Sequence, residues 1–421
     1  MKKIFIVISL LFTILKTEAQ SSVFVVVDSL LAEGNYQKAL TLLENTEPKT
    51  FLIFEKSAGI YQSIGSDTKA LECLNKALEF GTNESIKVKL AQLFVSTGFT
   101  SKAVDTYESL IEKDTSNLLV ANSLGRLYLS LNQAEKAEKI YRYLMKKDTV
   151  NPNYPYQLAE SLEKQNKQNK HSEMGQRYLD AYNLDTLHIK SILGLAQFFK
   201  SLKFKDSTSL FIDKGLKIDP NNLNFNQLKA NELYFLKDFN GALIYLKKLD
   251  SLNFVSVQIY EMFGMCYYNL QDFELAEKYF RNAINLDPDN SQILYRLASL
   301  YYDKKDNKMA TFYLHRSISS VKPDIDKQYY LLGIISKEAD NLQAAIENFE
   351  KSHKNNYKNY KALFELAVTS DAYFKDKKIA LKHYKSYAEK FNSSDNVMTA
   401  FVESRIIEIK KQYFIEGEIV D

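Results

Sequence analysis

The residue types that most often carry catalysis or hold metals are scattered along this chain. Its histidines stand alone, and none lies at a metal-binding spacing such as His-Glu-x-x-His. The sequence also lacks the Gly-x-Ser-x-Gly elbow of a nucleophilic serine, the Gly-x-x-x-x-Gly-Lys loop that cradles phosphate, and a Cys-x-x-Cys pair. We therefore expect no catalytic site, no bound metal and no cofactor. The histidines are His171, His188, His315, His353 and His383.

The two cysteines, Cys73 and Cys266, lie far apart in the sequence. A disulfide needs Cα atoms within about 7 Å of each other, and these residues fall at apolar positions of expected helices in distant parts of the chain. We predict two free thiols that act as small, buried hydrophobic side chains.

Three tyrosines, Tyr234, Tyr268 and Tyr302, recur at intervals of 34 residues. Tyrosine offers a large, rigid contact area at low entropic cost, and its hydroxyl can bond a peptide backbone or a sugar. The spacing indicates a ladder of tyrosines on one face of a repeating structure, with Tyr295 and Tyr330 beside it. Aromatic residues at helical spacing more often belong to a core. The alternative, that these rings pack on the next helices, therefore stays open.

The whole chain shares this period. A small residue expected early in a helix returns eleven times at intervals of 31 to 37 residues. A period near 34 that persists so long is typical of a solenoid, in which each helical pair buries its apolar face against its neighbours. Glycine and proline are scarce, which favours an all-α chain. The recurring positions are Ala39, Ala70, Ala103, Ala137, Met174, Thr208, Ala242, Ala276, Ala310, Ala345 and Ala380.

One segment, Val257–Asn290, shows the pattern most clearly. It carries, in order, Tyr260, Phe263, Gly264, Tyr267, Ala276, Phe280, Ala283 and Pro288. This resembles the tetratricopeptide pattern Trp-x2-Leu-Gly-x2-Tyr, followed by Ala-x3-Phe, Ala and Pro, with tyrosine at the tryptophan position. The resemblance covers roughly residues 20–390. It implies a right-handed superhelical solenoid of about eleven helix-turn-helix repeats, whose first helices line a concave groove.

Two repeats depart from the pattern. The loop Glu163–Glu173 is longer and rich in Gln, Asn and Lys, and it is followed by Met174 where alanine is usual. Thr208 replaces the alanine of the next repeat. We expect looser packing there and a bend or break near 165–190. The predicted divisions are residues 20–164 and 165–390 for two sets of repeats, and 391–421 for a terminal capping helix and tail.

The resemblance also implies which side chains face the groove, since these follow the motif positions of Trp, Gly and Tyr. Peptide-binding members of the family hold a C-terminal carboxylate with a Lys/Asn clamp. Here Asn122 and Arg126 approach that clamp but are followed by Tyr156 and Glu160, so such a receptor is not expected. The predicted partner-binding residues are Asn122, Arg126, Tyr156, Gln197, Asn231, Tyr234, Glu261, Tyr268, Tyr295, Tyr302, Tyr330 and Lys337.

Charge gives little support for nucleic acid as a partner, because the net charge is only +3 and the charges are finely mixed. One stretch, Lys351–Lys385, is locally rich in lysine. It is either the solvated outer face of two helices or a patch for an anionic partner.

The N-terminus resembles an export signal. A basic start at Lys2 and Lys3 precedes the apolar run Ile4–Leu15 and a small-x-small site that ends at Ala19. We predict a signal peptide over residues 1–19, and a periplasmic or secreted protein after cleavage near Ala19. The apolar run is short for a bilayer span, and no other stretch reaches 18 apolar residues, so no transmembrane segment is expected.

The combined prediction is a non-catalytic scaffold of the cell envelope that binds an extended protein or peptide segment in its concave groove. The alternative is a glycan-binding envelope protein that uses the groove tyrosines. Glycan-capturing outer-membrane proteins that it resembles usually carry a lipid-anchoring cysteine and a large insertion. Both features are missing from this sequence.

Overall fold

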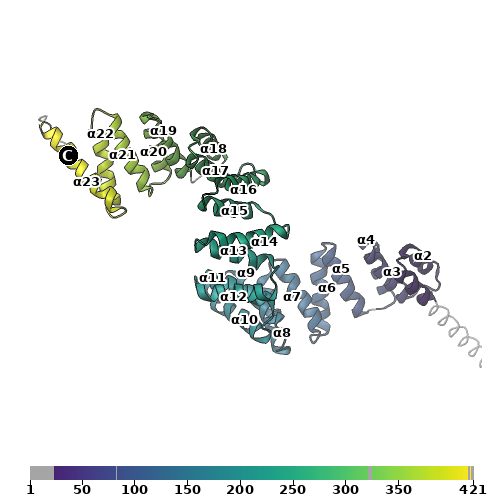
Figure 1. The fold of residues 1–421 in the computed structure, drawn as a ribbon. Helices are drawn as coiled ribbons and strands as arrows, with labels where there is room; N and C mark the ends of the chain where they lie inside the picture. The colour runs from purple at the N-terminus through teal and green to yellow at the C-terminus, as the bar shows by residue number, and fades with distance from the viewer. Residues whose placement is uncertain (1–22, 82, 321–324, 416–417, 419–421) are drawn as a thin grey trace, which may run out of the picture. The chain divides into compact units, whose positions relative to one another are not determined.

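The structure is a computed structural model that describes residues 23–81, 83–320, 325–415 and 418. Across these residues the chain forms helices joined by short turns, without a strand. The helices come in pairs (Figure 1), and the predicted all-α array of about eleven helix-turn-helix repeats is confirmed. The segment predicted as a signal peptide, residues 1–19 with cleavage near Ala19, lies outside the described residues.

The chain divides into two compact units, with the boundary between Phe211 and Ile212. The boundary falls inside α12 (Lys205–Ile218). The divisions predicted at 164/165 and 390/391 stay predictions.

The first unit begins with a helical stretch over residues 23–32. It continues with α2 (Tyr36–Asn45), α3 (Phe51–Ser63), α4 (Asp67–Leu78), α5 (Glu84–Ser96), α6 (Thr100–Lys113), α7 (Leu118–Ser130), α8 (Ala134–Lys147), α9 (Asn153–Gln165), the 3-10 turn η1 (Gln168–Lys170), α10 (His171–Leu184) and α11 (Ile189–Ser201).

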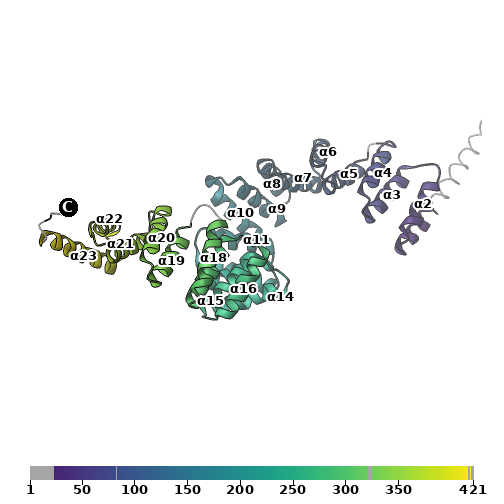
Figure 2. The ribbon, with the colours of Figure 1, turned by 90° about the horizontal axis from the view of Figure 1, so that it is seen from above.

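The second unit contains α13 (Leu223–Phe235), α14 (Phe239–Ser251), α15 (Val257–Asn269), α16 (Phe273–Leu286), α17 (Ser291–Asp303), α18 (Asn307–Ser320), α19 (Asp326–Glu338), α20 (Leu342–Asn355), α21 (Tyr360–Tyr373), α22 (Lys378–Phe391) and α23 (Asn396–Ile415). Odd-numbered helices up to α21 open a pair and even-numbered helices close it. Successive pairs of this unit lie side by side in both views (Figures 1 and 2). Each pair can therefore bury its apolar face only against its neighbours.

The recurring small residues all lie in the second helix of a pair, and all eleven are buried. The nine alanines are inaccessible to solvent, which confirms that the period marks the contact between helices. The two departures are also buried, with exposed fractions of 5 % for Met174 and 9 % for Thr208. The Thr208 hydroxyl donates to the carbonyl of Phe204 at 2.8 Å, so its polar group is satisfied inside the helix.

Close helix crossing explains the glycine of the motif. A Cβ added at Gly264 would lie 2.5 Å from the ring of Phe280 in the second helix of the same pair, and one at Gly333 would lie equally close to Phe349. Any larger side chain would therefore force these helices apart. Gly264 and Phe280 are both buried, as the motif predicts.

The turn inside a pair is built from two residues. The first has a left-handed backbone that ends the first helix, with φ of 61° at Gln271 and 64° at Lys305. The second caps the next helix. The Asp272 carboxylate accepts from the backbone N–H of Leu275 at 3.1 Å, and the side-chain oxygen of Asn341 accepts from the backbone N–H of Ala344 at 3.2 Å. This turn fixes the angle at which each pair folds back.

The long loop between α9 and α10 is tethered to α8 by ion pairs. Lys167 bonds Glu135 and Lys170 bonds Glu138, each at 2.6 Å. A third pair joins Arg142 to Glu173 at 2.8 Å. The loop turns at Asn166, whose backbone is left-handed, and then forms η1. A hinge at 165–190 stays a prediction.

The predicted capping helix is α23, which packs on α22 and buries Val402, Ile409 and Tyr413. Its Arg405 guanidinium donates two hydrogen bonds to the Asp371 carboxylate of α21, at 2.6 and 3.1 Å. None of the helices in the described residues is long and apolar enough to cross a bilayer.

Candidate functional site

The three tyrosines of the predicted ladder lie at the ends of α13, α15 and α17 in the second unit. Each is half-buried, so part of each ring stays open to solvent. Tyr268 donates its hydroxyl to the Asp303 carboxylate, and Tyr302 donates to Glu338 at 2.6 Å. Both acceptors lie at the end of the first helix of the next pair. Each tyrosine therefore links one repeat to the following one.

Tyr234 follows the same rule, because its hydroxyl is hydrogen-bonded to the Asn269 side chain. In all three cases the partner stands one position after the place that the ladder tyrosine holds in its own repeat: Asn269 follows Tyr268, Asp303 follows Tyr302, and Glu338 follows Lys337. Burial raises the pKa of Tyr302 to about 12, with a further contribution from Glu338, and burial followed by Asp303 also raises the pKa of Tyr268. These hydroxyls stay protonated at neutral pH and keep donating.

The acceptors of these bonds were missed in the sequence reading. Their signal was an Asn, Asp or Glu that follows each ladder tyrosine by 35 or 36 residues, at Asn269, Asp303 and Glu338. The alternative that the rings pack on the next helices is thus realised in part. The exposed part of each ring remains available, and a role in partner binding stays a prediction.

The two tyrosines beside the ladder lie against the core. Tyr295 is half-buried and packs on the apolar cluster of α13 to α19. Tyr330 packs on the next cluster, with its ring 5.9 Å from that of Phe349. Burial raises the pKa of both hydroxyls. These rings therefore contribute to packing in addition to any surface they present.

A cavity of about 310 Å³ brings together three of the predicted residues, namely Asn231, Tyr234 and Glu261. Met265 supplies an apolar wall, and Arg296 from the following pair closes one side. The Glu261 carboxylate accepts from Gln292 at 2.6 Å and lies 3.5 Å from Nε of Arg296. The cavity therefore combines apolar surface with polar groups from successive first helices, which is the usual composition of a binding pocket.

Other predicted residues have local partners. Lys337 forms an ion pair with Glu365 at 2.8 Å, and the Asn231 amide donates to the backbone carbonyl of Gln227 in its own helix at 2.9 Å. The sequence did not predict Arg296 as a groove residue, because it lies one position after Tyr295 and outside the motif positions that predict the groove.

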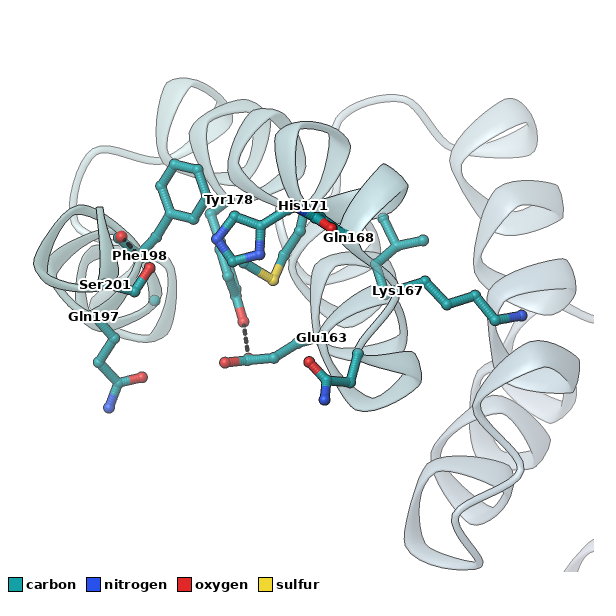
Figure 3. Close-up of a pocket in the computed structure, with 12 residues that line it drawn as sticks. Glu163, Lys167, Gln168, His171, Tyr178, Gln197, Phe198 and Ser201 are labelled. Carbon is teal, nitrogen blue, oxygen red and sulfur yellow. Dashed lines mark hydrogen bonds between the residues drawn. The ribbon is translucent and has the colours of Figure 1, made fainter.

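Four predicted residues, Asn122, Arg126, Tyr156 and Gln197, lie in the first unit. Arg126 and Gln197 are exposed, and Asn122 is half-buried. The Tyr156 ring lies 5.9 Å from that of Tyr178 and 5.5 Å from that of His188. Gln197 lines a separate cavity of this unit together with Tyr178 (Figure 3). A role of Asn122 and Arg126 in partner binding stays a prediction.

The lysine-rich stretch Lys351–Lys385 is partly engaged within the protein. Lys377 lies 3.4 Å from the Asp371 carboxylate and Lys378 bonds Glu418 at 2.6 Å, while Lys351 lies over the ring of Tyr329. An anionic partner for the rest of the stretch stays a prediction. Across the residues that the structure describes, no group of three His, Cys, Asp or Glu could hold a metal ion.

Comparison with known proteins identifies one segment. The family model described as tetratricopeptide repeat matches residues 257–290, the stretch formed by α15 and α16. No curated protein matches the chain. The match supports a protein-interaction scaffold, since proteins with this repeat typically bind other proteins and are non-catalytic. It does not favour glycan binding.

Several solved structures are similar in fold. A tetratricopeptide repeat protein from Parabacteroides merdae is 16% identical over 62% of this chain and 98% of its own, with a TM-score of 0.45. Yeast Tom70 is 15% identical over 96% and 98%, with a TM-score of 0.42. The C-terminal part of a TPR repeat-containing protein from Cytophaga hutchinsonii is 14% identical over 65% and 99%, with a TM-score of 0.42.

Proposed function

Because the chain is a tetratricopeptide-repeat protein, we propose that it is a non-catalytic scaffold that binds an extended protein segment on the first helices of its second unit. The observation that carries the proposal is the cavity where Asn231, Tyr234 and Glu261 converge beside Met265 and Arg296. Apolar walls suit a side chain of the bound segment. The amide, hydroxyl and charged groups can bond its backbone.

The fixed tyrosines support the same proposal. The hydroxyls of Tyr268 and Tyr302 are held by the next repeat, so these rings lose little conformational entropy when a partner covers them. Pre-organised aromatic surface of this kind binds at a lower entropic cost than mobile side chains. Affinity should therefore be spread over several repeats.

The test selects short peptides from a display library against the mature chain, residues 20–421, and measures the affinity of an enriched peptide. The double variant Asn231→Ala/Glu261→Ala should raise the Kd at least about tenfold, or ~1.4 kcal/mol. The matched control Lys247→Ala/Glu274→Ala changes two exposed residues of second helices, α14 and α16. It should bind like the wild type, and all three proteins should have the same helicity and Tm.

Two results would contradict this assignment. Equal affinity of wild type and double variant would place the partner surface elsewhere. Retention on an immobilised polysaccharide that the double variant loses would replace the protein segment with a glycan.

We further propose that the protein is exported. The basic start, apolar run and small-x-small site of residues 1–19 support this, because together they have the arrangement of a secretory signal. N-terminal sequencing of the chain recovered from the periplasm or medium should begin at Gln20. A chain that keeps Met1 and stays in the cytoplasmic fraction would refute export.

A further inference from the structure

The second unit has a further cavity, of about 860 Å³, which we call the α17–α19 cavity. It is formed by the turn before α17, the start of α19 and the turn after α20. Arg296 lines both this cavity and the one of the proposed function, and the amide of Gln292 on its wall donates to Glu261 of the other at 2.6 Å. The two cavities thus share a wall inside one unit, residues 212–421. A segment bound in the first can place a side chain in the second.

One wall of the α17–α19 cavity is a carboxylate that is almost wholly buried. Asp326, the first residue of α19, lines the cavity and is only 7 % exposed. Its Oδ2 accepts from the side-chain amides of Asn356 and Asn359, each at 3.1 Å. Among the hydrogen bonds and ion pairs of the described residues, none involves its Oδ1. The two amides are neutral, so they orient the carboxylate without neutralising its charge.

A second buried acceptor of this cavity lacks a partner. Gln328 lines the cavity and is 6 % exposed. Its Nε2 donates to the Ser317 hydroxyl at 3.1 Å, and that hydroxyl gives its one hydrogen to the backbone carbonyl of Ser291 at 2.8 Å. The Gln328 Oε1 is left buried with no hydrogen-bond partner in the described part of the chain. An unpaired buried acceptor costs free energy, which an N–H donor would recover.

The charge around these two residues is mainly negative. The Asp287 carboxylate accepts from an amide at 2.9 Å, Asp289 is exposed, and neither forms an ion pair with another described residue. Arg296 lies 3.5 Å from the Glu261 carboxylate, which offsets its charge, and Lys327 is exposed. The cavity therefore carries more negative than positive charge and attracts a cation.

An organic cation with several N–H groups matches this cavity. Its charge offsets that of Asp326, and its N–H groups are the donors that Oδ1 of Asp326 and Oε1 of Gln328 lack. The Tyr295 ring lines the cavity and packs on the apolar cluster, so it offers surface to a hydrocarbon stem. A neutral carboxamide would leave the buried charge unpaired. A metal ion is disfavoured, because no group of three His, Cys, Asp or Glu among the described residues could hold one.

We propose that the α17–α19 cavity binds the alkylammonium or alkylguanidinium group of a lysine or arginine side chain in the bound protein segment. The inference rests on the proposed function for the source of the cation. It deepens that function, because it names a residue type that the segment should carry.

The test uses the Tyr295 ring as a reporter, because it lines the cavity. The mature chain is labelled with ¹³C at the ε carbons of its tyrosines, and the Tyr295 signal is assigned with Tyr295→Phe. The cation n-butylguanidinium is then titrated against its neutral isostere n-butylurea. The guanidinium should shift the Tyr295 signal saturably, and the urea should not.

Three variants locate the binding. Asp326→Asn keeps the size of the side chain and removes its charge, so it should raise the Kd of n-butylguanidinium at least about tenfold. Gln328→Met removes the unpaired oxygen without touching Asp326 and should raise the Kd at least about threefold. The matched control Asp340→Asn removes an exposed carboxylate of the same unit, at a left-handed position that asparagine also adopts. It should leave the Kd unchanged.

An equal response to n-butylurea, or an unchanged Kd in both Asp326→Asn and Gln328→Met, would overturn the inference. The source of the cation is tested with the peptides enriched above, which should carry an arginine or lysine. Replacing it by citrulline or norleucine should weaken binding to the wild type at least about tenfold and to Asp326→Asn less than about twofold. Enriched peptides without a basic residue, or tighter binding of spermidine than of a basic peptide, would reject the side chain as the source.

Failure of the proposed function can be told apart from failure of this inference. Asn231→Ala alone leaves Glu261 and Arg296 in place, so it should weaken peptide binding and leave n-butylguanidinium binding unchanged. If n-butylguanidinium binds but no peptide does, the proposed function and the side-chain source fail together. If peptide affinity depends on Asn231 but not on Asp326, the proposed function stands and this inference fails.

Discussion

The hydroxyl of Tyr302 does one definable job, which is to donate to Glu338 in the next repeat at 2.6 Å. Tyr302→Phe keeps the ring and removes that bond, so we expect the free energy of unfolding to fall by ~0.5–1 kcal/mol, since the acceptor is exposed and can bond water. Urea unfolding followed by circular dichroism measures the change. Tyr357→Phe, at a tyrosine that is 68 % exposed, is the control and should leave the midpoint unchanged.

The same bond predicts a loss of stability in alkali. The folded pKa of Tyr302 is about 12, above the ordinary value of about 10 in the unfolded chain. Its contribution is therefore fully present below about pH 10 and is lost as the pH rises toward 12. Tyr302→Phe should be less sensitive than the wild type in this window. Identical pH profiles would show that the bond does not form.

The two thiols should differ in reactivity. Cys266 is inaccessible, and burial raises its pKa to about 12, whereas Cys73 is half-buried with a pKa that burial also raises. Because the thiolate is the reactive form, DTNB at pH 8 should modify no more than one thiol per native chain, at Cys73. Both should react in urea. Rapid modification of two thiols in the native protein would contradict the packing of α15.

At the scale of elements, the loop after α9 depends on Glu138. Partial burial raises the pKa of this carboxyl, but hydrogen bonds from Lys170, Gln165 and Arg142 outweigh it and lower the pKa to about 2. A lowered folded pKa means that the stabilisation is present above about pH 4.3 and is lost as the pH falls toward 2. The loop should therefore loosen in acid before the array unfolds.

Glu138→Gln should produce the same loosening at neutral pH. It removes the charge that binds Lys170 and Arg142, which we expect to cost the loop ~1–2 kcal/mol. Hydrogen-exchange protection factors over residues 166–173 should fall in the variant at pH 7 and in the wild type near pH 3. Glu135→Gln, which changes the exposed partner of Lys167, should lower the protection factors less than Glu138→Gln does. Unchanged protection in Glu138→Gln would refute this account.

An ion pair joins the terminal helix α23 to α21, in addition to the apolar packing of α23 on α22. Partial burial raises the pKa of the Asp371 carboxyl, but Arg405 and Lys377 outweigh this and lower it. Arg405→Met leaves that carboxylate with Lys377 and the Tyr384 hydroxyl on its own side and removes its bond to α23, so we expect α23 to detach locally at a cost of ~1–3 kcal/mol. Limited proteolysis should cut the variant near residues 392–396 while the rest stays folded. Glu408→Gln, which changes the exposed partner of Arg405, should stay resistant.

At the scale of the whole chain, the repeat was readable from the sequence because nine of the eleven recurring positions where two helices cross carry a buried alanine. Ala276 and Gly264 are such small residues in a single repeat, and the period can be checked by counting along one dimension. The links between repeats could not be read in the same way. Whether Tyr268 reaches Asp303 depends on how far one helix pair is staggered against the next.

The candidate sites were harder to predict for a related reason. Gln197 was predicted from its motif position, but its neighbours in the cavity, Glu163 and Met174, lie at the end of α9 and in α10, on either side of the loop where the pattern fails. A consensus describes what repeats share, whereas a binding site needs what one repeat has alone. The residues that break the pattern are thus the ones that sequence periodicity explains least.

The rule that joins each ladder tyrosine to the next repeat also bears on how such an array can change its length. The partner stands one position after the place that the ladder tyrosine holds in its own repeat, so removing residues 257–290 as one block would bring Asp303 to the place that Asn269 now holds beside Tyr234. After the deletion, the two repeats would still be linked by a hydrogen bond, now from the Tyr234 hydroxyl to the Asp303 carboxylate. Gene duplication or loss of a whole repeat can therefore lengthen or shorten this chain without a new joint having to evolve.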